Sequence, residues 1–70
     1  MILYGDITRL EAEARFGFIR DDAGMNWFFL ADGVRGGRFE HLWVGERVGF
    51  VAEATPSGPR AADVHHEQLD

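Results

Sequence analysis

Aromatic side chains are the residues of this sequence best suited to chemistry, because a flat ring exposed to water can stack on another flat ring. The rings are concentrated in two short runs, residues 15–19 and residues 26–30, with a turn-forming stretch between them. Side chains two positions apart on a strand share one face, so Phe16 and Phe18 lie together. A domain this small buries only one face of such a hairpin. The sequence therefore predicts an aromatic face in contact with solvent, and such a face usually binds a partner.

The opposite interpretation, that these rings form the core, is the common one for aromatic residues. The chain contains other residues for that purpose, and we expect a core made of Ile7, Ile19, Trp27, Phe29, Val48 and Phe50. Phe16, Phe18 and Phe28 are then left for the solvent-facing side of the hairpin. Phe39 lies in a connection, where burial and binding are equally open. Arg9 is either a solvated strand residue or one whose guanidinium stacks on a base.

The remaining reactive side chains do not form a catalytic or metal-binding pattern. Asp21 and Asp22 precede Ala-Gly, and aspartates at such positions are usually turn formers. His65 and His66 are adjacent, so on a strand they point to opposite sides. Ser57 lies between turn residues with no base positioned to activate it, and the chain contains neither cysteine nor lysine. We expect no enzymatic activity, no cofactor and no metal.

Length and charge set further limits. Seventy residues make one small domain, which we expect to cover residues 1–66 with a frayed tail over residues 67–70. Twelve acidic residues against seven arginines give a formal charge of −5, which disfavours non-specific binding to duplexes but does not exclude single strands. The first apolar run is too short for a signal peptide, and no run reaches transmembrane length. We therefore expect a cytoplasmic protein without a membrane partner.

Five short strands are expected to position the aromatic face. The predicted strands cover residues 2–10, 15–20, 25–31, 48–53 and 60–65. Residues 8–14 match a helix-capping pattern, but two helical turns do not hold themselves, so this stretch is assigned to the end of the first strand and a loop. The connection over residues 32–39 should contain a helical turn near residues 33–35. The inward positions expected on later elements are Leu42, Ala52, Ala62 and Val64. This pattern predicts a small all-β barrel of five strands, closed or partly closed.

Two motifs and several single residues occur in an order that is typical of a known family. Residues 14–19, Ala-Arg-Phe-Gly-Phe-Ile, and residues 27–31, Trp-Phe-Phe-Leu-Ala, resemble the two ribonucleoprotein motifs of the cold-shock domain. Further matches cover nearly the whole chain, at Gly5, Ile7, Phe39, Leu42, Gly45, Arg47, Val48, Phe50 and residues 58–64. The resemblance implies a five-stranded antiparallel OB-fold barrel that binds single-stranded RNA or DNA without catalysis. It also implies roles such as RNA chaperoning or regulation of transcription or translation.

The sequence departs from this family at the binding platform. Arg9 and Leu10 stand where the family has aromatic residues, while Leu30 and Ala31 replace a histidine and a phenylalanine of the second motif. Each stacked base is worth about 1–3 kcal/mol, so the loss of several rings predicts weak and largely sequence-independent binding. The resemblance and the aromatic pattern together assign nucleic-acid binding to Arg9, Arg15, Phe16, Phe18, Phe28, Leu30, Arg38 and Phe39.

A protein partner is the alternative ligand for the same barrel. The acidic balance and the reduced platform favour it, and a more aliphatic patch would then be formed by Leu10, Phe28, Leu30 and Ala31. Trp43 would either cover the barrel end or extend that patch as an exposed anchor. The chain is expected to be a monomer or a weak homodimer.

Overall fold

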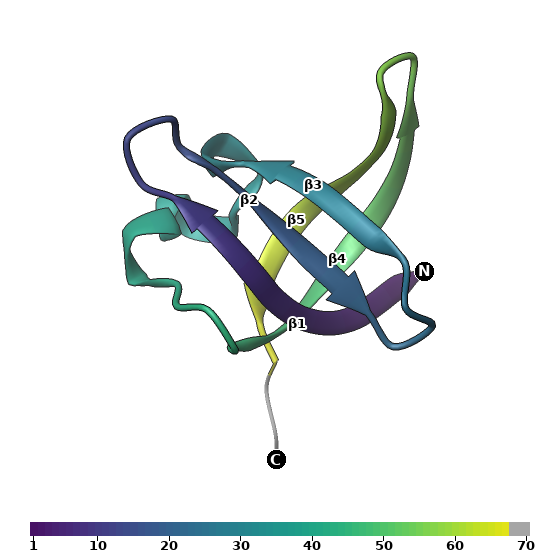
Figure 1. Ribbon diagram of the computed structural model, residues 1–70, viewed down its shortest axis with the longest axis horizontal. Coiled ribbons are helices and arrows are strands. Elements are labelled where there is room, and N and C mark those ends of the chain that lie inside the picture. The colour runs from purple at the N-terminus through teal and green to yellow at the C-terminus, as the bar shows by residue number, and fades with distance from the viewer. Residues whose placement is uncertain (68–70) are drawn as a thin grey trace.

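Within residues 1–67, which the computed structural model describes, five strands close into a barrel in the order β1-β2-β3-β5-β4 (Figure 1). They are β1 (Ile2–Glu11), β2 (Phe16–Asp21), β3 (Asn26–Leu30), β4 (Arg47–Thr55) and β5 (Gly58–His66). Neighbouring strands are antiparallel apart from β3 and β5, which meet in parallel at Phe28 and Arg60. The predicted all-β OB-fold barrel is confirmed, with this parallel pair as its departure from antiparallel order.

β1 is long enough to pair with strands on both of its sides. Its first half runs beside β4 and its second half beside β2, with a register shift between Ile7 and Arg9. At Gly5, where the two pairings overlap, a β-carbon would collide with the backbone of Arg20. β1 continues to Glu11, and a turn covers residues 12–15. The strand interpretation of this stretch is therefore confirmed over the helical one.

The turn between β2 and β3 is built by two aspartates. One carboxylate oxygen of Asp21 accepts two backbone N–H groups within the turn, at 2.9 and 2.8 Å. The other accepts the indole N–H of Trp27 at 2.8 Å, and these hydrogen bonds, led by the indole, hold the pKa of Asp21 below its usual value. Asp22 pairs with Arg47 of β4 through both carboxylate oxygens. The expected turn role is confirmed, and Asp22 also ties the hairpin to β4.

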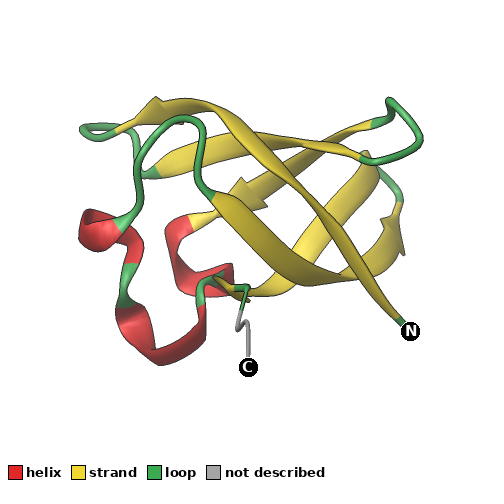
Figure 2. Ribbon diagram, turned by 90° about the horizontal axis from the view of Figure 1, so that it is seen from below, coloured by secondary structure: helices red, strands yellow, loops and turns green. Residues whose placement is uncertain are grey.

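Three short 3₁₀ turns between β3 and β4 lie at one end of the barrel (Figure 2). They are η1 (Ala31–Gly33), η2 (Arg35–Gly37) and η3 (Phe39–His41). The helical turn expected near residues 33–35 is replaced by turns on either side of Val34, which is extended. Val34 is buried and forms a parallel bridge with Val64 of β5. This bridge fastens the connection to the barrel.

The barrel interior is filled largely by the expected side chains. Buried as predicted are Ile7, Ile19, Trp27, Phe29, Val48, Phe50 and Val64. Leu42 is half-buried and packs against this core. The expectation for Ala52 is wrong, because this residue is exposed. Ala52 lies opposite Ala61 of β5, but the buried stretch of β4 ends at Phe50, and the residues after it are half-buried or exposed.

β5 also departs from the predicted alternation. Ala61, rather than Ala62, takes the inward position, with only 1% of its surface exposed. The next inward residue is Val64, three positions later instead of two. Asp63 has a left-handed backbone, with φ of 51°, and it inserts one extra residue between the two inward side chains. The expectation for Ala62 is therefore wrong.

The described chain stays attached to the barrel as far as Glu67. Its backbone N–H donates to the carbonyl of Arg47 at 3.2 Å, and its carboxylate accepts the Arg47 Nε–H at 2.7 Å. Glu67, which was expected to belong to the frayed tail, is therefore attached to the barrel. The rest of that expected tail, residues 68–70, lies outside the described residues. Over residues 1–67, no helix has the length and apolar character needed to cross a membrane.

The register of β5 can be tested by enlarging neighbouring alanines. Ala61→Val should lower the free energy of unfolding by about 1–3 kcal/mol, because a larger side chain overpacks the filled interior. Ala62→Val, the matched control one residue later, should change it by less than about 0.5 kcal/mol. Urea denaturation of both variants measures the difference. A larger loss for Ala62→Val would contradict the register described above.

Candidate nucleic-acid interface

Three phenylalanine rings lie together on the outer surface of β2 and β3. Phe18 pairs with Phe28 across the two strands, and Phe16 pairs with Leu30. The Phe28 centroid is 5.6 Å from each of the other two, which are 6.0 Å apart. All three side chains are half-buried, whereas the residues between them along each strand are buried. We call Phe16, Phe18 and Phe28 the aromatic face, since they present ring surface to solvent side by side.

Gly17 allows the strand beneath this face to lie close to the core. A β-carbon at Gly17 would come within 2.6 Å of the Phe29 ring and 2.8 Å of the Arg9 carbonyl oxygen. Because glycine leaves that space free, Phe29 can fill the interior directly behind the strand that carries Phe16 and Phe18. The half-buried rings of Phe16 and Phe18 are therefore supported from inside by the core.

Arg9 and Leu30 lie beside the aromatic face, as the sequence predicts. The Arg9 guanidinium carbon is 5.8 Å from the centre of the Phe16 ring, within the range of a cation–π contact. Its Nε–H donates to the carboxylate of Glu11 at 2.7 Å. Leu30 is half-buried opposite Phe16. Both residues therefore border the rings, but in the free protein Arg9 is already engaged by a carboxylate.

Phe39 is separated from the other rings. It is 5% exposed, and its centroid is 6.3 Å from that of Phe29 in the core. The Arg15 guanidinium carbon lies 5.5 Å from the Phe39 ring centre, and Arg15 also donates to Glu40 at 2.6 Å. The sequence left open whether Phe39 is buried or available for binding, and in the structure it is buried. In this conformation Arg15 covers Phe39, and the ring is not offered to a base.

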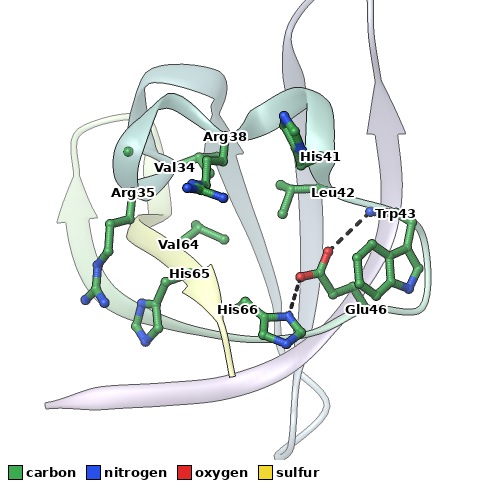
Figure 3. A pocket seen from close by; sticks show the side chains of 11 residues that line it. Val34, Arg35, Arg38, His41, Leu42, Trp43, Glu46, Val64, His65 and His66 are labelled. Atoms are coloured by element: carbon green, nitrogen blue, oxygen red, sulfur yellow. Dashed lines mark hydrogen bonds and ion pairs between the residues drawn. The ribbon is translucent and has the colours of Figure 1, made fainter. Parts of the chain in front are cut away.

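Arg38 lies in a different part of the molecule. Its side chain lines a cavity formed by the β3–β4 connection and β5, together with Leu42 and Val64 (Figure 3). The tight backbone of Gly36 and Gly37, with φ of 68° and 66°, turns the chain immediately before Arg38. The structure thus does not bring this predicted site residue together with the aromatic face.

Two further arginines belong beside the aromatic face and were not assigned to it from the sequence. Arg20 continues the alternation of Phe16 and Phe18 along β2, and it is exposed. Arg60 of β5 pairs with Phe28 across the parallel β3–β5 contact. Over residues 1–67, neither side chain forms an ion pair within 4.0 Å. The period-two pattern could have identified Arg20, whereas Arg60 depends on a long-range strand pairing.

Comparison with known families decides what this barrel is. A family model described as the 'Cold-shock' DNA-binding domain matches residues 3–67. The chain belongs to the cold-shock domain family. Cold-shock domains bind nucleic acid, and this one places its aromatic face on the two strands that carry both ribonucleoprotein-like motifs. A search of curated proteins found no match to the chain.

Acidic side chains limit the positive potential of this cold-shock domain. Arg9 pairs with Glu11, and Arg15 pairs with Glu40, at N–O distances of 2.7 and 2.6 Å. The hydrogen bond from Arg15 holds the pKa of Glu40 below its usual value, so this carboxylate stays charged at neutral pH. A phosphate approaching either arginine must compete with a carboxylate already in place. Arg20 and Arg60 therefore offer the more accessible positive charge near the rings.

Proposed function

We propose that this cold-shock domain binds single-stranded RNA or DNA by stacking bases on Phe16, Phe18 and Phe28. The observation that carries the proposal is the cluster of three half-buried rings, 5.6–6.0 Å apart, on one outer surface of the barrel. Rings at this spacing can each accept a base, and a single strand can expose its bases in a way that a duplex cannot. Arg20 and Arg60 would contact the phosphates that flank the stacked bases.

Binding through this surface is weak and largely independent of sequence. Stacking accepts every base, because each base has an aromatic face. The platform is short of rings, since Arg9, Leu10 and Leu30 border it without adding a stacking surface of full size. Glu11 and Glu40 neutralise Arg9 and Arg15, which weakens the attraction for phosphates. These properties fit a protein that keeps RNA or DNA strands transiently unpaired, as an RNA chaperone or a regulator of transcription or translation does.

The rival hypothesis, a protein partner on the same surface, receives less support. Its aliphatic patch loses Ala31, which is 7% exposed, while Leu10 and Leu30 are half-buried to the same degree as the three phenylalanines. Trp43 is 55% exposed and lies near His66, with centroids 6.2 Å apart, at the end of the barrel where the 3₁₀ turns are. It therefore does not extend the aromatic face. The structure leaves the three phenylalanines as the main apolar feature of that surface.

Removing one ring tests the stacking mechanism. Phe18→Ala should weaken binding to a short oligopyrimidine about 5- to 150-fold, because one stacked base contributes about 1–3 kcal/mol. Tyr4→Ala is the matched control, since Tyr4 is 40% exposed but pairs with Gly49 on β4, away from the rings. Fluorescence anisotropy of the labelled oligonucleotide measures both affinities. Equal affinities for Phe18→Ala, Tyr4→Ala and wild type would refute the site assignment.

Removing an acidic neighbour tests the electrostatic part. Glu40→Gln should strengthen oligonucleotide binding at low salt by up to about fivefold, because it releases Arg15 from an exposed pair worth up to about 1 kcal/mol. Glu67→Gln is the control: it makes the same charge change, but its partner Arg47 stays paired with Asp22. The gain should shrink as salt is added. If both variants gain equally, net charge rather than the Arg15–Glu40 pair explains the effect.

A further inference from the structure

A second candidate binding site lies between the β3–β4 connection and β5 (Figure 3). It is a cavity of about 420 Å³, within the size range of small-molecule sites in proteins. Its floor is apolar and consists of Val34, Leu42 and Val64. Its rim carries both rings and cations, from Arg35, Arg38, His41, Trp43, His65 and His66. The protein has a net charge of −5, so a cavity with this many basic side chains around an apolar floor is unusual for it.

A buried carboxylate organises one wall of the cavity. Glu46 is only 3% exposed, and its Oε1 accepts the backbone N–H of Trp43 at 3.3 Å. Its Oε2 lies 2.9 Å from Nδ1 of His66. The centroids of the Trp43 indole and the His66 imidazole are 6.2 Å apart, and their planes are tilted by 46°. Since 55% of the Trp43 surface is exposed, this wall presents aromatic surface to a ligand.

The opposite wall carries an available cation. Arg35 is held by Asp63 through two hydrogen bonds, at 2.9 and 2.7 Å. Arg38 is exposed, and in the described part of the chain its guanidinium forms no ion pair within 4.0 Å. Gly36, next to it on the wall, has no side chain to obstruct the approach. Among the residues of 1–67 that line the cavity, Glu46 is the one carboxylate, and both its oxygens are occupied.

We infer that this cavity binds a nucleotide, with the base stacked on Trp43 and the phosphate paired with Arg38. A guanidinium can donate two parallel hydrogen bonds to a phosphate, and tryptophan is a strong stacking surface. The apolar floor accommodates the sugar and base edge between them. An acidic peptide could use Arg38 but would leave the aromatic wall unused, so the nucleotide fits the lining better. The site is separate from the aromatic face and does not depend on the function proposed for that face.

The indole N–H signals of the two tryptophans allow a direct test by NMR. Titration of the ¹⁵N-labelled protein with AMP should move the signal of exposed Trp43 and leave that of Trp27, which is buried and bonded to Asp21, unchanged. Adenosine and inorganic phosphate should each bind more weakly than AMP. Arg38→Gln should weaken AMP binding about tenfold, the effect of losing hydrogen bonds to a charged group. Arg47→Gln is the matched control and should leave AMP affinity unchanged, because Arg47 does not line the cavity and is paired with Asp22 and Glu67.

The nucleotide could come from solution or from the end of a bound strand, and the second source rests on the function proposed above. A 5′-phosphorylated oligothymidine and its unphosphorylated form separate the sources. Movement of Trp43 with the phosphorylated strand alone assigns the cavity to a strand terminus, and movement with AMP assigns it to free nucleotides. The inference is overturned if neither ligand moves Trp43, if Arg38→Gln changes nothing, or if an aspartate-rich peptide binds as tightly as AMP. Loss of oligonucleotide binding in Phe18→Ala with AMP binding intact would leave this site standing.

Discussion

Along β2 and β3, side chains enter the barrel interior only at alternate positions, and this constraint determines where the aromatic residues of these two strands lie. On β2 and β3 the interior is taken by Ile19, Trp27 and Phe29, while Gly17 leaves room for the Phe29 ring. Phe16, Phe18 and Phe28 occupy the intervening positions and have no place inside. A slip of one residue would exchange the two sets and expose the core. The aromatic face therefore follows from the same register that fills the barrel.

Charge then limits what this face can do. Within residues 1–67, four of the seven arginines, Arg9, Arg15, Arg35 and Arg47, pair with carboxylates. Exposed pairs of this kind contribute little to stability, up to about 1 kcal/mol each, but they occupy the groups that would otherwise contact phosphate. The binding mode that we propose therefore relies on the rings, with Arg20 and Arg60 as the accessible cations nearby. In that mode a bound strand would be released easily.

The sequence was sufficient for the features that depend on local pattern. Alternation over residues 16–20 and 26–30 predicted both the strands and the outward rings, and the ordered motifs predicted the family and the OB-fold. Features that depend on distant contacts were not predicted. Because of the extra residue at Asp63, Ala61 faces the interior in place of the predicted Ala62. The parallel pairing of β3 with β5 places Arg60 beside Phe28. No local sequence pattern predicts this pairing.

The β3–β4 connection was the least predictable segment, because its path depends on glycines and on one tertiary bridge. Left-handed Gly36 and Gly37 and the contact between Val34 and Val64 carry Arg38 away from the rings and into the cavity. They also leave Phe39 buried against Phe29. The same segment thus removes two expected residues from the aromatic face and supplies the walls of a second site. The domain consequently has two separate surfaces suited to flat, charged ligands.

Nucleic-acid binding by the aromatic face is tested most directly by following the backbone amide NMR signals of the labelled protein while a short oligopyrimidine is added at low salt. Stacking on the aromatic face predicts shifts concentrated at Phe16, Phe18 and Phe28 and at the adjoining Arg20 and Arg60. These shifts should diminish as salt is added, because phosphate contacts are screened. A spectrum that does not change at high micromolar oligonucleotide, or that changes only far from these strands, would contradict nucleic-acid binding by the aromatic face.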